Sequence, residues 1–308
     1  MCKLIMAKAI NRMRKGHRGK LAILWPCLAL CSTLLFNSIG KSQNTVLWSI
    51  EHRDCPHRSY LLGTLHQVGN TWVDSLGGLL SALASSELAI FESIDPAEQL
   101  MANMNLREAD HSYREVFRPR EVAWLEGYSS DWTVPLHKLS PIELYWKLNQ
   151  ELTKELCGSV REGDRFDHMD QYLYHLADSL GIETLGLETD SAQSRLINEG
   201  IGSNTWKAMR PMIRKDIRSM RKGKANAGRC ELVHRYMRLD IGNYALDAPC
   251  PVDDPVIAER NAQWMEVLPQ LLMERSCFIA VGLMHLFKDC GLINRLQEAG
   301  FVVAPIGI

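Results

Sequence analysis

Two histidines follow short apolar runs at the same spacing. The run YLLGTLH ends at His66 and the run FIAVGLMH ends at His285, so both carry the pattern Gly-x-x-His, with Gly63 and Gly282. Glycine has no Cβ, which lets a chain turn sharply or approach another group closely as it leaves a strand. A histidine three residues later projects over the strand end, where ligands usually bind in α/β proteins. A single copy is most simply a hydrogen-bonded structural histidine, but two matching copies favour a shared site.

Two glutamates close similar apolar runs. Glu92 follows LAIF and Glu188 follows LGL, and each could either cap a following helix or point into the cleft that contains the histidines. Two imidazoles with one or two carboxylates form a divalent-metal site with positions open for water and substrate. Such a metal lowers the pKa of its bound water towards roughly 7 and polarises a carbonyl, and a spare glutamate can accept the water proton.

The elements that must position these residues can be read from the hydrophobic pattern. Short apolar runs between turn residues predict six strands, at residues 45–50, 60–62, 88–91, 184–187, 277–281 and 301–304. Residues 95–180 and 204–245 are expected to be mostly helical, with further helices at 256–272 and 292–298. Asp170 is the expected N-cap of a helix that ends near Gly181. Because strands occur at both ends of the chain, we expect one α/β domain.

The first forty residues resemble an export signal. They contain seven basic residues and no acid, and residues 21–36 are an uncharged apolar stretch. This stretch suits the core of a signal peptide better than a full membrane span, which needs roughly 20 residues. Ser38 and Gly40 are suitable small residues before a cut at Lys41. An uncleaved membrane anchor at 21–36 is the alternative, and both interpretations predict a periplasmic or extracellular body at residues 41–308.

The composition of the body limits its partners. Hydrophobic residues make up 46% of the chain and charged residues 23%, which excludes a disordered, collagen-like or coiled-coil protein. Residues 41–308 contain 28 basic and 36 acidic residues, which argues against a nucleic-acid partner. Their six cysteines permit up to three disulfides in an oxidising compartment and lack the spacing of a cysteine–zinc site.

Eight basic residues lie between positions 207 and 224, opposite an apolar stripe if this segment is helical, although Pro211 could kink the helix. A solvated helix face is the simpler interpretation of this cluster. A patch for a membrane surface or an anionic ligand is the alternative.

With these motifs the sequence resembles the TraB/GumN family, which includes the Tiki proteins. The resemblance rests on both Gly-x-x-His motifs, on Glu92 after the first, and on the pair Arg260-Asn261 before the second. It extends from residue 46 to residue 305, with further matches at Asp170, Leu173, Ala177, Gly186, Glu188, Thr189, Gln193, Leu286, Gly291, Leu292 and the closing segment GFVV.

The resemblance implies a single α/β domain with a mixed sheet. We expect this domain to be built from two quasi-repeated halves, with a helical insertion at its centre. It also implies a metal-dependent hydrolase, which acts as a peptidase in some animal members. His66 and His285 would hold Mn, Co or Zn, with Glu92 as a further ligand or as the base. Arg260 would stabilise negative charge on the tetrahedral intermediate, or would instead form a structural salt bridge. Residues expected to contact the substrate or support the site are Gly63, Gly282, Glu188 and Asn261.

The sequence also departs from the family pattern. Lys288 stands where many members have glycine, and Cys290 stands where an acid is common. The loop after the second motif is therefore expected to be stiffer or shifted, which affects substrate access more than metal binding. Ser93 replaces a common hydrophobic residue after Glu92, a milder change.

These observations predict an exported hydrolase that acts on a peptide or another acyl bond. A protein that binds a metal or a metal-containing ligand without turnover is the first alternative, and a metal-free scaffold braced by the two motifs is the second. His168 and His175 are seven residues apart on one predicted helix face and are interpreted as surface residues, and His52 and His57 lie in a turn. No Gly-x-Ser-x-Gly elbow, P-loop or dinucleotide-binding motif occurs.

Overall fold

The structure is a computed structural model, which describes residues 45–200, 204–225, 228, 230–241, 248–250 and 255–308. The predicted export segment at 1–40 lies outside the described residues. Residues 42–308 form a single compact unit. Of the helices in the described part of the chain, none has the length and hydropathy needed to cross a membrane.

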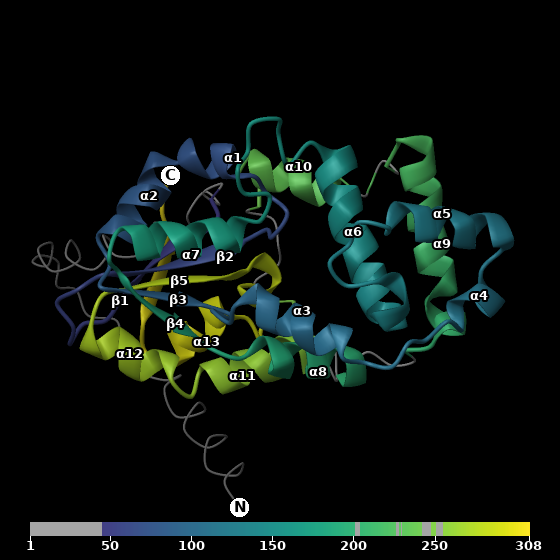
Figure 1. Ribbon diagram of the computed structural model, residues 1–308. Helices are drawn as coiled ribbons and strands as arrows, with labels where there is room; N and C mark the ends of the chain where they lie inside the picture. The colour runs from purple at the N-terminus through teal and green to yellow at the C-terminus, as the bar shows by residue number, and fades with distance from the viewer. Residues whose placement is uncertain (1–44, 201–203, 226–227, 229, 242–247, 251–254) are drawn as a thin grey trace, which may run out of the picture. The chain divides into compact units, whose positions relative to one another are not determined.

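One mixed sheet of six strands forms the centre of this unit (Figure 1). Strand β1 is antiparallel to both of its neighbours, β2 and β6, whereas β2, β5, β3 and β4 are parallel to one another. The order across the sheet is β4-β3-β5-β2-β1-β6. All six predicted strands are confirmed, with the bounds β1 Leu47–Glu51, β2 Ser59–Thr64, β3 Leu88–Phe91, β4 Glu183–Gly186, β5 Cys277–Gly282 and β6 Val302–Pro305.

Helices cover both faces of the sheet. Helices α1 (Asn70–Asp74) and α2 (Gly77–Ala84) lead from β2 to β3, and α7 (Met169–Ser179) leads into β4 on the same face. Helices α11 (Arg260–Trp264) and α12 (Leu268–Glu274) lead back to β5 on the opposite face. This arrangement is the one that right-handed crossovers between parallel strands require. The central strands β3 and β5 are buried throughout, so the main core lies on both faces of them.

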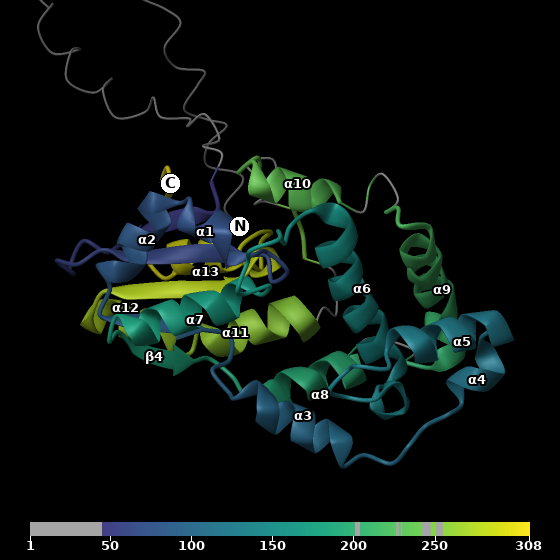
Figure 2. The same cartoon turned by 45° about the horizontal axis from the view of Figure 1, so that its top comes forward.

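The predicted helical insertion is confirmed between β3 and β5. Helices α4, α5, α6 and α9 gather beside the sheet in both views (Figures 1 and 2) and share a separate hydrophobic core that includes Tyr113, Leu148, Trp206 and Ile213. The bounds of these and the remaining helical elements are α3 Ala97–Asn105, α4 Tyr113–Val116, α5 Pro119–Tyr128, η1 Leu136–Lys138, α6 Pro141–Cys157, α8 Asp190–Gly200, α9 Trp206–Lys222, α10 Glu231–Met237, η2 Pro255–Glu259, η3 Leu283–His285 and α13 Leu292–Glu298.

Local signals explain where α6 begins and ends. Ser140 and Glu143 form a capping box in which each side chain accepts a hydrogen bond from the other residue's backbone N–H. Pro141 follows at the first helical position, where its missing N–H costs nothing. The helix ends at Cys157 and is followed by Gly158 as the C-cap, whose left-handed φ of 67° suits glycine.

Three expectations are corrected or limited by the structure. The single helix expected at 256–272 is wrong: it is divided into a π-helix at η2, then α11 and α12, with Pro269 in the first turn of α12. A proline fits there because the first turn of a helix needs no partner for that N–H. Two quasi-repeated halves are not confirmed. Among the six cysteines that the structure describes, two disulfides form, Cys157–Cys230 and Cys250–Cys290, while Cys55 and Cys277 are free.

Candidate functional site

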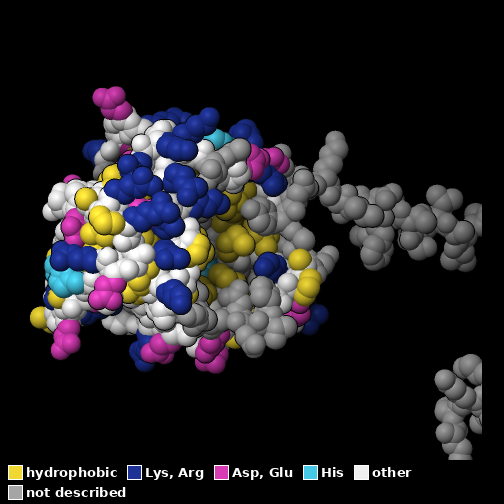
Figure 3. Space-filling model, turned by 90° about the vertical axis from the view of Figure 1, so that its right-hand side faces the viewer, with side chains coloured by type: hydrophobic (Ala, Val, Ile, Leu, Met, Phe, Trp, Pro, Cys, Tyr) yellow, Lys and Arg dark blue, Asp and Glu magenta, His cyan; other side chains and the backbone are white. Residues whose placement is uncertain are grey.

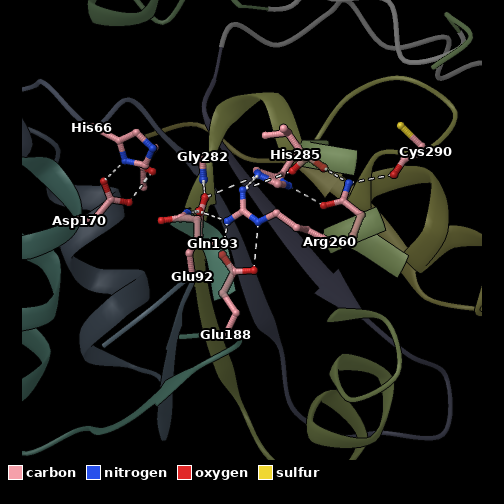
Figure 4. A network of polar contacts seen from close by, with 12 residues as sticks. His66, Glu92, Asp170, Glu188, Gln193, Arg260, Gly282, His285 and Cys290 are labelled. Atoms are coloured by element: carbon pink, nitrogen blue, oxygen red, sulfur yellow. Dashed lines mark hydrogen bonds and ion pairs between the residues drawn. The ribbon is translucent and has the colours of Figure 1, made fainter. Parts of the chain in front are cut away.

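The carboxyl ends of four parallel strands bring the predicted site residues together (Figure 4). His66 follows β2, His285 follows β5, Glu92 follows β3 and Glu188 follows β4. Because these strands lie in the order β4-β3-β5-β2, their carboxyl ends form one edge of the sheet. Residues separated by more than 200 positions in the sequence therefore meet at one place, as ligand sites in α/β folds usually do.

Gly282 lies at the centre of this group. A Cβ on Gly282 would be 3.1 Å from Oε1 of Glu92, 3.6 Å from Nε2 of His66 and 3.7 Å from Cδ2 of His285. The two imidazoles and the carboxylate thus converge on one point, and a side chain at position 282 would fill the space between them. Close approach, and not a left-handed turn, is what requires glycine here, because φ of Gly282 is −52°.

Gly63 has a different role from Gly282. A Cβ on Gly63 would come within 2.6 Å of the Leu283 side chain and 3.0 Å of the Leu286 side chain. The first motif therefore packs directly against the second, which fixes the spacing between the strand ends. Gly63 therefore supports the site through packing between the two motifs, whereas Gly282 is in contact with the site residues.

Glu92 is held by three donors. Its Oε1 accepts the backbone N–H of Gly282 at 2.6 Å, and its Oε2 accepts Nε2–H of Gln193 at 2.9 Å and a hydrogen bond from Nη2 of Arg260. Burial opposes ionisation of the carboxyl, but the guanidinium of Arg260 and the protonated ring of His66 hold the pKa of Glu92 below its ordinary value. The side chain is therefore a buried, oriented carboxylate at neutral pH.

Arg260 joins both glutamates to the second histidine. Its Nε donates to Oε2 of Glu188 at 3.0 Å, Nη2 donates to Glu188 and Glu92, and Nη1 donates to Nε2 of His285 at 2.9 Å. Nη1 also donates to the Val256 carbonyl at 3.4 Å. Arginine has five N–H donors, and all of them are engaged in these contacts. The guanidinium is thus a fixed bridge in the site.

The tautomer of His285 follows from its two partners. Arginine only donates, so Nε2 of His285 accepts and the ring proton lies on Nδ1, which donates to Oδ1 of Asn261 at 2.7 Å. Asn261 in turn donates to the backbone carbonyls of His285 and Cys290, each at 2.9 Å. Burial next to Arg260 lowers the pKa of His285 to about 3, so the ring is neutral.

His66 is oriented by a carboxylate that the sequence analysis placed elsewhere. Oδ2 of Asp170 lies 2.6 Å from Nδ1 of His66, and Oδ1 accepts the hydroxyl of Thr64 at 2.6 Å. Asp170 is therefore not the N-cap of α7, a position that His168 occupies. Burial works against protonation of the ring, but Asp170 raises the pKa of His66 to about 9. This pair leaves Nε2 of His66 directed towards Gly282 and Glu92.

His168, expected on the surface, is half-buried with 27% of its side chain exposed, and it contacts the site. Its ring stacks on that of His66, with centroids 5.3 Å apart, and its Nδ1 is buried with no hydrogen-bond partner among the described residues. One ligand atom each from His66, His168 and Asp170 lie within 4.8 Å of one another. Burial lowers the pKa of His168 to about 4, which leaves the ring neutral and able to accept.

The side chains offer two overlapping sets of metal ligands that share His66. In the predicted set, His66, Glu92 and His285 approach one point at Gly282, but their ligand atoms do not all lie within 4.8 Å of one another, and Nε2 of His285 would have to give up its hydrogen bond from Arg260. The carboxylate of Asp170 on the other nitrogen of His66 is the arrangement that usually supports a metal-binding histidine. The second set is His66, His168 and Asp170. Imidazole and carboxylate ligands of either set suit Mn, Co or Zn.

The loop after the second motif, where the sequence departs from the family pattern, is tied to residues 248–250 by three contacts. Cys290 forms a disulfide with Cys250, and Asp289 accepts the backbone N–H of Cys250 at 2.8 Å. The Asp289 N–H donates to the Ala248 carbonyl at 3.1 Å. Lys288 has a left-handed φ of 68°, a conformation that glycine adopts without strain.

The site contains four polar side chains that the sequence analysis did not assign to it: Thr64, Asp170, Gln193 and His168. Asp170 and Gln193 lie at positions that match the family pattern, and this match was the only indication in the sequence that they belong to the site. His168 precedes Asp170 by two residues, and its proximity to His66 could not be read from the sequence.

Comparison with known proteins gives one match. The model of the TraB/PrgY/gumN family matches residues 46–305, which is most of the chain. No curated protein and no solved structure matches this sequence significantly.

Proposed function

This chain belongs to the TraB/PrgY/gumN family, and we propose that it hydrolyses a peptide or another acyl bond after export, with the help of a divalent metal ion. The observation that supports this most is the convergence of Glu92, His66 and His285 around Gly282. An ionised carboxylate and two imidazoles of different protonation preference are the groups that acyl hydrolysis needs.

Glu92 is the residue best placed to handle the proton of the attacking water. The Gly282 amide, Gln193 and Arg260 keep its carboxylate ionised and oriented. In the proposed reaction, Glu92 takes one proton from water as the water oxygen bonds to the carbonyl carbon, and returns it to the leaving nitrogen or oxygen as the acyl bond breaks. A bound divalent metal would polarise the carbonyl and lower the pKa of the water towards roughly 7.

The metal would be held by His66 and His285, and Glu92 would be either a third ligand or, as in the step above, the base beside it. Asp170 fixes the ring of His66 so that Nε2 faces Glu92, and Asn261 fixes the ring of His285 with its proton on Nδ1. In that tautomer Nε2 of His285 has a lone pair, which a metal would take in place of the hydrogen bond from Arg260. The set His66, His168 and Asp170 is the second candidate, favoured by the buried Nδ1 of His168.

Arg260 acts in this proposal as a positioning residue. Without a metal, all of its N–H groups are engaged by Glu188, Glu92, His285 and the Val256 carbonyl, so none is free to bind an oxyanion unless a metal on His285 releases one from Nη1. Its bridge instead sets the orientation of Glu92 and the tautomer of His285. Glu188 keeps the guanidinium in place and serves the site through it.

The direct test is hydrolysis of a broad peptide library by purified protein in the presence of Mn²⁺, Co²⁺ or Zn²⁺. We expect cleavage by the wild type and a loss of at least ~100-fold in Glu92→Gln, because the base is removed while the shape is kept. Glu98→Gln, an exposed residue of α3, is the matched control and should cleave normally. Metal binding without turnover of any substrate would instead support the non-catalytic binding protein, and absence of bound metal would support the scaffold.

A further inference from the structure

A pocket lined by basic side chains lies between the start of α5 and the second half of α9. Its volume is about 310 Å³. Figure 3 shows the concentration of Lys and Arg on this face of the molecule. The lining residues are Arg118, Arg120, Glu121, Arg214, Ile217, Arg218, Arg221 and Lys222.

The positive charge of the pocket is not neutralised by its one acid. Oε1 of Glu121 accepts a hydrogen bond from Nε of Arg214 at 2.9 Å, and Oε2 accepts the backbone N–H of Arg118 at 3.0 Å. Both oxygens of Glu121 are therefore used to hold Arg214 and to cap α5. Among the described residues, no ion pair is formed by the five other cations of the pocket: Arg118, Arg120, Arg218, Arg221 and Lys222.

The exposed face of α9 continues this charge. It presents basic residues and no acid, since Asp216, the only acid of the helix, is 1% exposed. The opposite face is fixed in the second core by Trp206, Met209, Ile213 and Ile217. Because residues 41–308 carry a net negative charge, the cluster is not a consequence of a basic composition. Like charges gathered on a rigid surface repel one another, and a bound anion removes that repulsion.

We propose that this pocket binds a compact anion that carries phosphate groups. Five of its six cations are arginines, whose planar forks of donors match phosphate oxygens in pairs. A volume of about 310 Å³ suits a few phosphate groups better than an extended polymer. The phosphate can belong to a soluble molecule or to a lipid headgroup. The pocket shares no residue with the strand-end site, so this inference does not depend on the proposed hydrolysis.

The first experiment titrates full-length protein in neutral detergent with inorganic tripolyphosphate by calorimetry, at roughly 0.1 M salt, where exposed charges are already screened. We expect saturable binding that Arg218→Glu/Arg221→Glu weakens by at least ~10-fold. Arg218→Lys/Arg221→Lys should weaken it to a smaller extent, because charge is kept and the fork is lost. Arg53→Glu/Arg161→Glu, which makes the same change in net charge at exposed positions outside the pocket, should bind as the wild type does.

The second experiment identifies the source of the phosphate. Full-length protein is sedimented with vesicles of phosphatidylcholine alone, which report any association through residues 21–36, and with vesicles that also contain phosphatidylglycerol. If the protein binds the anionic vesicles more strongly than the neutral ones, and tripolyphosphate displaces this extra binding, the ligand is a lipid headgroup. If the protein binds tripolyphosphate but shows no extra binding to the anionic vesicles, the ligand is a soluble molecule. No binding of either probe, or binding that the Arg218→Glu/Arg221→Glu variant retains, overturns the proposal.

Discussion

His66 and His285 are both histidines of the site, but their surroundings shift their pKa values in opposite directions. Asp170 raises the pKa of His66 to about 9, whereas burial beside Arg260 lowers the pKa of His285 to about 3. At neutral pH and without metal, His66 is protonated and His285 is neutral with a fixed tautomer. Groups whose pKa values are driven apart in this way can take different roles in one reaction.

The ion pair of His66 with Asp170 makes a prediction for stability. Because the pKa of His66 is raised above its ordinary value of 6.5, the pair stabilises the folded state fully below about pH 6.5, and this contribution is lost as the pH rises towards about 9. In metal-free protein, Asp170→Asn should therefore lower the melting temperature more at pH 6 than above pH 9. Thermal unfolding followed by circular dichroism measures the difference.

A matched control is Asp167→Asn, which removes an ion pair with Lys154 that contains no histidine. Its effect on the melting temperature should be the same at both pH values. An equal effect of Asp170→Asn at pH 6 and above pH 9 would contradict the assignment of the His66 pKa.

Lys288 gives a second prediction at the scale of one residue. A side chain in the left-handed region costs roughly 1 kcal/mol, and glycine avoids this cost. Lys288→Gly should raise the free energy of unfolding by about 0.5–1 kcal/mol in urea titrations. Lys288→Ala removes the same charge but keeps the Cβ, so it should give no gain. Equal stabilisation by both variants would show that charge, and not backbone strain, is responsible.

The two disulfides support different elements. Cys250–Cys290 fixes the segment that follows the second motif, and Asn261 connects the Cys290 carbonyl to the backbone and ring of His285. Cys157–Cys230 instead joins the end of α6 to the start of α10, away from the strand ends. Loss of the first should therefore affect the site, and loss of the second should affect stability.

The prediction compares Cys250→Ser/Cys290→Ser with Cys157→Ser/Cys230→Ser. Each pair should lower the free energy of unfolding by about 2–4 kcal/mol, because the unfolded chain gains freedom. Only the first pair should also reduce hydrolysis, measured well below both melting temperatures, since it frees the segment that positions His285. Equal activity of the two variants would show that the Cys250–Cys290 disulfide does not influence the site.

Local signals made most elements predictable, and contacts between distant segments explain the failures. The strands were found because short apolar runs are bounded by turn residues, and the ends of α13 matched the expected bounds. The helix expected at 256–272 failed although Pro269 marked its break. Asp170 looked like an N-cap, but its carboxylate instead binds Thr64 and His66, more than 100 positions away.

At the scale of the whole molecule, the sequence revealed which residues meet but not how. The paired motifs identified His66, His285 and Glu92, because repeated patterns at strand ends are visible in one chain. The strand order that brings them together, and the position of His168 beside His66, depend on packing across the whole fold. Likewise, the basic cluster at 207–224 was visible in the sequence, but the pocket that α9 forms with the start of α5 was not.

The central claim is that the side chains around Gly282 form one metal-dependent hydrolytic centre. Elemental analysis of purified wild type and of His66→Ala, His285→Ala and His168→Ala variants tests it most directly. We predict roughly one Mn, Co or Zn ion per wild-type chain, lost in His66→Ala and His285→Ala and retained in His168→Ala. If the metal is instead lost in His168→Ala and retained in His285→Ala, the metal site is the set His66, His168 and Asp170. A wild-type chain without bound metal, and unchanged in melting temperature by chelator, would contradict the claim.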